Sequence, residues 1–278
     1  MPEGDTLHIT ANTLRPALVG KVVRRIDFAR LAGDSSILVG TTVIEVEAEG
    51  KNLLVRFDNG LVLHTHLKMP GIWHLYRPGE AWRRSPSAAR VVLEVDGFQA
   101  VCFSAPVVRV LEEASVRRDR QLANLGPDLL AETFDAGVAV SRLRALADWP
   151  LGVAVMHQAA VAGIGNVYKS ELLFLEKLNP FEPVSSVSDE ALAALLERAR
   201  DLMQRNVARP GQKRTTRFEG KSDATRVWVY RRKGMPCFRC GTTIRMKRQG
   251  EALRSTYFCP TCEGVTPEEL AMLFRSGP

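Results

Sequence analysis

The chain has 278 residues, of which 45% are hydrophobic and 25% are charged. This composition excludes a disordered, collagen-like or fibrous protein, and the length suits one large domain or two to three small ones. The net charge is +7, and the excess of basic residues is concentrated in residues 205–248, which hold 14 Lys/Arg and 2 Asp/Glu. The other 234 residues hold 24 Lys/Arg and 29 Asp/Glu. Such a basic block indicates a polyanionic partner, either a nucleic acid or an anionic membrane surface.

The first third of the chain is predicted to be rich in β-structure behind one short helix. Residues Thr6–Leu14 can form one or two helical turns, which Pro16 limits. Residues Val43–Glu47 alternate apolar and acidic side chains, as a half-buried strand does. Asp58-Asn59-Gly60 and Asp96-Gly97 are turn signals of two hairpins. The strands expected beside these turns are Leu53–Phe57 with Leu61–His66, and Arg90–Val95 with Phe98–Phe103.

After Leu125-Gly126-Pro127 the pattern changes to the period of helices. The predicted helices are Asp135–Ala147, Val153–Ala162, Asn166–Leu175 and Asp189–Asn206. The last one places its leucines on one face, and Ser188 is its expected N-cap. Thr266-Pro267-Glu268-Glu269 is a capping box that begins a final short helix.

Three further segments have no clear helical period. Residues 77–89 are polar, basic and contain proline, so they are expected to form an exposed loop. Residues 211–226 are expected to form a mobile basic loop, and Val227–Val229 a short strand.

These patterns predict an α+β multidomain protein. An N-terminal antiparallel β-sandwich with a flanking helix would span residues 1–125, and a helical domain with its basic loop would span residues 126–226. A β-hairpin metal domain would follow at residues 227–263, and a short helical tail at residues 264–278. We found no internal repeat.

The four late cysteines form the strongest chemical motif. Cys237 with Cys240 and Cys259 with Cys262 are two C-x2-C pairs at a separation typical of a tetrahedral zinc site. Four unrelated buried cysteines are the alternative. With no ligand position open, the one zinc ion would be structural, and it would fold a hairpin that carries Arg254. The fifth cysteine, Cys102, lies in an apolar strand and is expected in the core.

Two other places carry residues suited to chemistry. Gly163-Ile164-Gly165-Asn166 lies between two predicted helices, so the backbone N–H groups and the Asn166 side chain can bind a phosphate; a turn without a ligand is the alternative. Removal of Met1 would give Pro2 a free secondary amine, which titrates near pH 8 and is partly neutral at pH 7. With Glu3 and Lys51, this amine supplies the groups that Schiff-base chemistry requires. The alternative is an ordinary chain start.

Together these motifs resemble the formamidopyrimidine-DNA glycosylase / endonuclease VIII family of base-excision repair enzymes. The resemblance covers about residues 1–263. It rests on four ordered segments, which are Met1-Pro2-Glu3-Gly4, Gly50-Lys51-Asn52-Leu53-Leu54, the helix–two-turn–helix motif from Gly163 to Glu171, and the zinc finger from Tyr230 to Cys262. Leu125-Gly126-Pro127-Asp128 is similar to the family's interdomain linker.

The resemblance implies a bifunctional DNA glycosylase and abasic-site lyase that acts on a flipped base in damaged double-stranded DNA. Pro2 would attack the sugar C1′, and Glu3 would donate the proton that opens the sugar ring. Lys51 would hold a phosphate and serve β-elimination, and Arg254 would grip the flanking phosphate and assist δ-elimination. Asn166 would bind the same backbone. The protein is expected to be a monomer in the bacterial cytoplasm, associated with the nucleoid and not with a membrane.

The resemblance favours the endonuclease VIII branch, whose substrates are oxidised pyrimidines and abasic sites. The purine-specific branch usually carries Asp-Pro-Arg-Arg-Phe-Gly after the second hairpin, where this chain has Ser104-Ala105-Pro106-Val107-Val108-Arg109. The purine-specific branch and a catalytically silent binder of damaged DNA are the alternatives.

A loop at Lys68-Met69-Pro70-Gly71 matches the family segment that fills the void left by the flipped base. Met69 would be the wedge and Lys68 a DNA contact, whereas a core position for Met69 is the alternative. Lys68 replaces a polar amide of the endonuclease VIII pattern, and Asn124 stands where an arginine DNA contact is common.

Overall fold

The computed structural model describes residues 2–29, 35–120, 122–220, 222 and 225–275. The chain forms two compact units, Met1–Leu125 and Gly126–Pro278. Met1, which must be removed for Pro2 to act as a nucleophile, and Lys221, Asp223 and Ala224 of the basic segment lie outside the described residues. None of the described helices is both long and apolar enough to cross a membrane.

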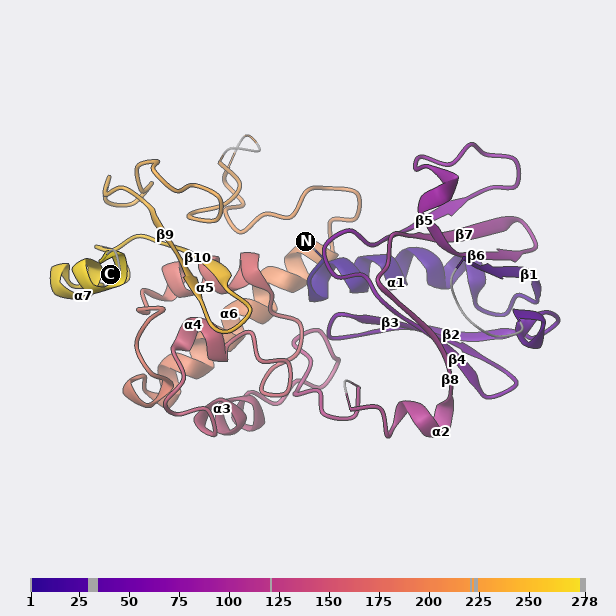
Figure 1. Ribbon diagram of the computed structural model, residues 1–278, viewed down its shortest axis with the longest axis horizontal. Helices are drawn as coiled ribbons and strands as arrows, with labels where there is room; N and C mark the ends of the chain where they lie inside the picture. Colours follow the sequence, from indigo (N-terminus) through magenta and orange to yellow (C-terminus); the bar gives the residue numbers. More distant parts are fainter. Residues whose placement is uncertain (1, 30–34, 121, 221, 223–224, 276–278) are drawn as a thin grey trace. The chain divides into compact units, whose positions relative to one another are not determined.

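The N-terminal unit is a sandwich of two four-stranded antiparallel sheets with one long helix (Figure 1). One sheet has the strand order β1-β6-β7-β5 and the other β2-β3-β4-β8. Helix α1 (Gly4–Leu18) contacts strands of both sheets. The strands are β1 (Val23–Phe28), β2 (Val43–Glu49), β3 (Asn52–Phe57), β4 (Leu61–His66), β5 (Ile72–Tyr76), β6 (Ala89–Val95), β7 (Phe98–Phe103) and β8 (Val107–Glu112), with the short helices η1 (Ser35–Leu38), η2 (Pro86–Ala88) and α2 (Glu113–Val116).

The core of this unit follows from alternation along the strands and from the spacing of α1. Leu7, Leu14 and Leu18 of α1 are fully or almost fully buried against the inner faces of the sheets. The helix was predicted to stop near Pro16, but it continues to Leu18. Burial of the last apolar turn offsets the hydrogen bond that proline cannot donate.

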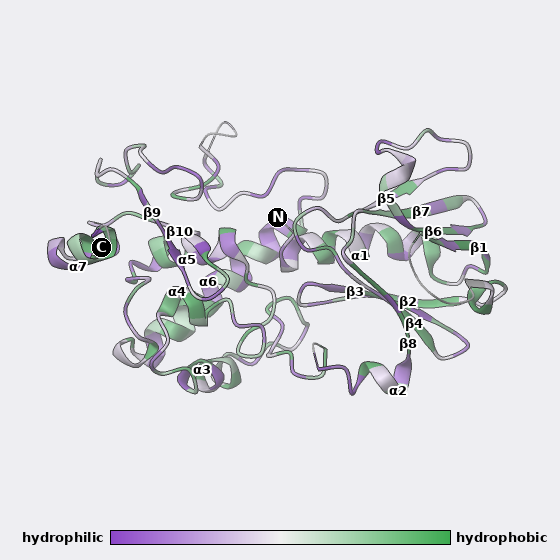
Figure 2. Ribbon diagram, in the orientation of Figure 1, coloured by the Kyte–Doolittle hydropathy of each residue, from purple (hydrophilic) through white to green (hydrophobic). Residues whose placement is uncertain are grey.

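The second unit combines helices with one hairpin. Its elements are α3 (Ala136–Arg144), α4 (Leu151–Ala154), α5 (Asn166–Glu176), η3 (Val184–Ser186), α6 (Asp189–Val207), β9 (Arg245–Gln249), β10 (Arg254–Phe258) and α7 (Pro267–Phe274). The predicted caps are present, since the Ser188 hydroxyl accepts from the Ala191 N–H at 3.2 Å and Thr266 forms its capping box with Glu269. Figure 2 shows green, apolar strands in the sandwich and a mostly purple, polar β9–β10 hairpin.

Two predicted elements of this unit are wrong, and in each case another partner takes the backbone hydrogen bonds. The helix predicted at Val153–Ala162 is only α4, because the Gln158 carbonyl accepts from Gly126 and the Ala162 N–H donates to Pro127. The strand predicted at Val227–Val229 does not form, because the N–H groups of residues 228 and 229 donate to a side-chain carboxylate. Periodicity alone does not reveal such competing partners.

The basic segment 211–226 is anchored where it was predicted to be mobile throughout. The Asn206 amide accepts from the Thr215 N–H at 2.9 Å and donates to the Thr215 carbonyl at 2.8 Å. The N–H groups of Thr216 and Arg217 donate to the Arg226 carbonyl at 2.9 and 3.0 Å. Both ends of the segment are therefore held by hydrogen bonds.

Candidate functional site

The start of the chain is organised by the first turn of α1. Glu3 is the N-cap, and its carbonyl accepts from the N–H groups of Thr6 at 2.9 Å and Leu7 at 3.2 Å. The Glu3 side chain is fully buried, and neighbouring Asp5 accepts from the Thr6 N–H at 2.7 Å. The positive end of the helix dipole suits a carboxylate at this position. Pro2 precedes this carboxylate directly and lies at a fixed helix terminus.

Lys51 lies in the turn between β2 and β3, at the same end of the sandwich where β4 ends. Asn52 stabilises this turn, since its amide donates to the Glu49 carbonyl at 3.1 Å and its Oδ1 lies 2.9 Å from Nε2 of the buried His64. The register of β3 and β4 pairs Asn52 with His66. Lys51 is therefore adjacent to the last residue of β4.

His66 belongs to the candidate site, although no sequence motif indicated it. Burial, followed by the charges of Lys51 and Lys68, lowers the pKa of His66 to about 4. Nδ1 of His66 accepts from the Lys68 N–H at 3.2 Å, so the neutral ring carries its proton on Nε2. We call Lys51, His66 and Lys68 the basic cluster. The strand register was the signal that would have identified His66.

The turn after β4 presents Met69 to solvent. Lys68 has a φ of 45°, and the Gly71 N–H closes the turn on the Leu67 carbonyl at 2.9 Å. A Cβ at Gly71 would approach the Leu67 oxygen to 2.5 Å, so only glycine fits this turn. Met69 is 63% exposed, so the alternative that it is a core residue is wrong. An exposed methionine on a tight turn is suited to insertion into a partner.

In the second unit, Asn166 and Arg254 are brought together through Ser255. Asn166 begins α5 after Gly165, and its Nδ2 donates to the Ser255 hydroxyl at 3.0 Å. Arg254 precedes Ser255 on β10 and is exposed, whereas Asn166 is 5% exposed. Lys169, fully buried one turn along α5, donates to the Ser255 carbonyl at 3.1 Å. The N-terminal end of α5 is thus fastened to the strand that carries the finger arginine.

Glu171 is a second polar anchor between α5 and the finger. Its fully buried carboxylate accepts from the N–H groups of Trp228, Val229 and Tyr230 at 2.7, 2.9 and 2.8 Å, and from the Thr216 hydroxyl. Burial raises the pKa of Glu171, while these donors act in the opposite direction. The signal in the sequence was an acidic residue within an apolar helix, which requires such partners.

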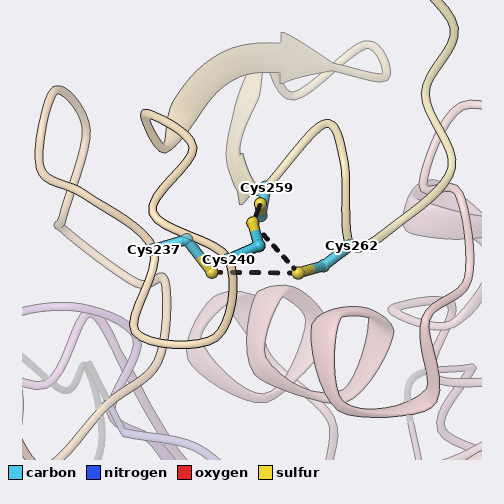
Figure 3. A group of neighbouring side chains, drawn as sticks. All are labelled: Cys237, Cys240, Cys259 and Cys262. Carbon is cyan, nitrogen blue, oxygen red and sulfur yellow. Dashed lines mark hydrogen bonds between the residues drawn. The ribbon is translucent and has the colours of Figure 1, made fainter.

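The four finger cysteines converge on one point (Figure 3). Their sulfur atoms all lie within 4.8 Å of one another. Cys237 lies 3.8 Å from Cys262, and Cys240 lies 3.4 Å from Cys259 and 3.5 Å from Cys262. A zinc ion with Zn–S bonds of about 2.3 Å requires sulfur separations of about 3.8 Å in a tetrahedron. The donor set and its spacing fit a structural zinc ion, and they exclude four unrelated buried cysteines.

Comparisons with known proteins cover most of the chain. The formamidopyrimidine-DNA glycosylase N-terminal domain matches residues 1–109, and the helix–two-turn–helix domain of the same glycosylase matches residues 125–218. The zinc finger found in this glycosylase and in isoleucyl-tRNA synthetase matches residues 234–263. The three matches follow the order of the basic cluster, the Asn166 turn and the four cysteines along the chain.

Individual proteins and a solved structure of the same family are similar to this chain over most of its length. A probable endonuclease 8 2 of Streptomyces coelicolor is 41% identical over 95% of this chain and 94% of its own length. The DNA-(apurinic or apyrimidinic site) lyase Nei2 of Mycolicibacterium smegmatis is 38% identical over 95% of this chain and 99% of its own length. The crystal structure of the formamidopyrimidine-DNA glycosylase of Thermus thermophilus matches with a TM-score of 0.79 and 29% identity over 96% of this chain and all of that one. The chain therefore belongs to the formamidopyrimidine-DNA glycosylase / endonuclease VIII family of base-excision repair enzymes.

Proposed function

We propose that this protein is a bifunctional DNA glycosylase and abasic-site lyase that removes oxidised pyrimidines and cleaves the strand by β,δ-elimination. The observation that carries the proposal is the chain start, where Pro2 precedes the buried carboxylate of Glu3 at the N-terminus of α1. Once Met1 is removed, the Pro2 amine is a nucleophile whose neighbouring acid is held in place by the helix. The same unit carries the basic cluster for a phosphate.

The reaction begins when the Pro2 nitrogen forms a bond to C1′ and the C1′–base bond breaks, so the base leaves with the electrons of that bond and takes up the proton that the Pro2 nitrogen loses. As the base leaves, Glu3 protonates the ring oxygen O4′, so the sugar opens and the C1′–N bond becomes the double bond of an iminium ion. Loss of a proton from C2′ then expels the 3′-phosphate, and a second elimination expels the 5′-phosphate. Lys51 holds a phosphate during the first elimination, and Arg254 holds the flanking phosphate during the second. Hydrolysis of the imine regenerates Pro2.

DNA binding in this proposal uses groups from both units. Lys68 and the neutral His66 are N–H donors for the backbone near Lys51, and exposed Met69 fills the space left by the flipped base. Asn166 and Arg254 bind the backbone in the second unit, where one zinc ion maintains the finger. Solved formamidopyrimidine-DNA glycosylases include one from Lactococcus lactis bound to DNA with an abasic site, which is 22% identical and shares the fold. We propose that the protein acts as a monomer at the bacterial nucleoid.

The pyrimidine branch is favoured by the order of the similarities. The identity is 41% and 38% to endonuclease 8 2 and Nei2 proteins, and 30% to the Thermus thermophilus formamidopyrimidine-DNA glycosylase. Thymine glycol and dihydrouracil are therefore the expected substrates. Faster removal of 8-oxoguanine than of either pyrimidine would overturn this assignment.

Borohydride trapping on an abasic-site duplex tests the chemistry. Reduction of the imine should link the wild-type protein to DNA covalently, and Pro2→Gly should abolish the link. Glu3→Gln should prevent excision of thymine glycol while duplex binding is retained, because the amide cannot donate the proton. Absence of a covalent product with wild-type protein, or its undiminished formation in Pro2→Gly, would contradict the mechanism.

A further inference from the structure

The loop between β5 and β6 carries a positive charge that the proposed reaction does not use. Residues 77–90 include four arginines and a single acidic residue, Glu80. Arg77, Arg83 and Arg84 are exposed. We call residues 77–88 the arginine loop.

The arginine loop is fixed to the sheet by an aromatic anchor. The ring of Trp82 lies 5.5 Å from that of Phe103 and 6.5 Å from that of Tyr76, and its Nε1 donates to Gln99 at 2.5 Å. The Arg83 N–H donates to the Tyr76 hydroxyl at 3.0 Å. These contacts fix the backbone at the position from which Arg83 and Arg84 project.

The two guanidinium groups are available for a partner. Within the described part of the chain, neither Arg83 nor Arg84 forms an ion pair. The carboxylate of the nearby Glu80 accepts from the Arg77 N–H at 2.8 Å instead. Burial is the largest cause that lowers the pKa of His74, and the charges of Arg83 and Arg84 lower it as well. Adjacent arginines on a fixed backbone, without an ion pair, are well suited to phosphate oxygens, which they bind in a bidentate manner.

We propose that the arginine loop is a second DNA-backbone contact, which binds phosphates of the duplex that flanks the lesion. The loop lies at the opposite end of β5 from the Lys68–Met69 turn, and a five-residue strand spans about 17 Å. At about 3.4 Å per base pair, this distance corresponds to about five base pairs of DNA. This inference rests on the proposed function, because Met69 marks the lesion. It extends the DNA footprint of the N-terminal unit to sequence-independent contacts on one flank.

The test compares duplexes that carry a tetrahydrofuran abasic analogue. One duplex has about fifteen base pairs on each side of the lesion, and two others have either flank shortened to about four. Arg83→Ala/Arg84→Ala is compared with wild type in a salt series. Arg24→Ala/Arg25→Ala is the matched control, since it removes the same charge from exposed arginines that are already paired, Arg24 with Asp96 at 2.8 Å.

Wild type should bind the long duplex about tenfold more tightly than the Arg83/Arg84 variant, and the variant's salt slope should be smaller by about two. Shortening one flank should remove this difference, and the Arg24/Arg25 control should bind like wild type. Equal affinities for the long duplex, a loss that persists in both of the short-flank duplexes, or an equal loss in the control would overturn the proposal, and the first result would favour an acidic protein partner. Borohydride trapping with wild type on the same long duplex, bearing a true abasic site, reports separately on the proposed function.

Discussion

The sandwich and the finger are both antiparallel β-structures, yet different interactions hold them. The sandwich buries apolar residues from both sheets and α1, including Leu7, Leu53 and Val91, in one core. The β9–β10 hairpin carries Arg245, Lys247 and Arg248 along one strand and buries few apolar side chains. Four cysteines and the polar anchors on α5 replace the missing core. A surface this basic is compatible with folding because stability comes from a metal site and buried polar groups.

The strongest test of this comparison is removal of a zinc ligand. Cys240→Ser should lose zinc and unfold residues 234–263, because metal binding supplies on the order of 10 kcal/mol to a domain of this kind. DNA affinity should fall at least about 100-fold, while the sandwich remains folded. Metal analysis, limited proteolysis and binding assays measure these effects.

Cys102→Ala provides the control, since Cys102 is buried in the sandwich. This variant should retain zinc and lose only part of the sandwich stability. Wild-type protein without zinc, or a finger that resists proteolysis in Cys240→Ser, would contradict the comparison.

The second test concerns the buried carboxylate. Glu171→Gln keeps the shape but replaces one acceptor oxygen with an NH₂ group that faces other donors, so the second unit should lose about 3 kcal/mol of unfolding free energy. Glu176→Gln on the same helix is the control, because its pair with Arg198 is at the surface and should contribute at most about 0.5 kcal/mol. Urea unfolding measures both. Equal losses in the two variants would show that Glu171 is not an anchor.

The third test concerns a buried histidine, which should make the stability of the sandwich depend on pH. The pKa of His64 is lowered from an ordinary value near 6.5 to about 4, first by burial and then by the charge of Arg109. As the pH falls, His64 therefore takes up a proton more readily in the unfolded chain than in the folded protein, which favours unfolding. The free energy of unfolding should be unaffected by His64 above pH 6.5 and should decrease as the pH falls through about 4. The loss should be about 3 kcal/mol. His64→Gln should unfold with a flatter pH dependence, and an unchanged dependence would contradict the assignment.

The sequence predicted local elements well where one pattern dominated. The two hairpins, α6 and the capping box of α7 are confirmed, because turn residues and apolar spacing agree there. The cysteine cluster is confirmed for the same reason, since ligand spacing encodes it directly. Glu171, His66 and Ser255 were missed as contacts, because their roles depend on residues distant in sequence. The roles of Pro2, Glu3, Lys51 and Arg254 remain predictions from the family resemblance.

The smallest expected effect concerns Ser255, which accepts hydrogen bonds from Asn166 and Lys169 and lies beside Arg254, a proposed phosphate contact. Oδ1 of Asn166 is buried without a partner among the described residues, while Nδ2 bonds to the Ser255 hydroxyl. The Ser255 hydroxyl can also donate a hydrogen bond. If it donates to Oδ1 of Asn166, the side-chain amide is flipped and its NH₂ group can donate to a phosphate. Ser255→Ala should therefore weaken abasic-site binding by about 1 kcal/mol, roughly fivefold.

Ser255→Thr should restore most of this affinity because it keeps the hydroxyl, and Asn166→Ala should make the Ser255→Ala change neutral. The ratio of β- to δ-elimination products gives a second readout, because Arg254 is the next residue on β10. A loss in Ser255→Ala that persists in the Asn166→Ala background would mean that Ser255 acts on DNA by itself. That result would show that polar contacts between α5 and β10 only support the finger and do not position the groups proposed to bind phosphate.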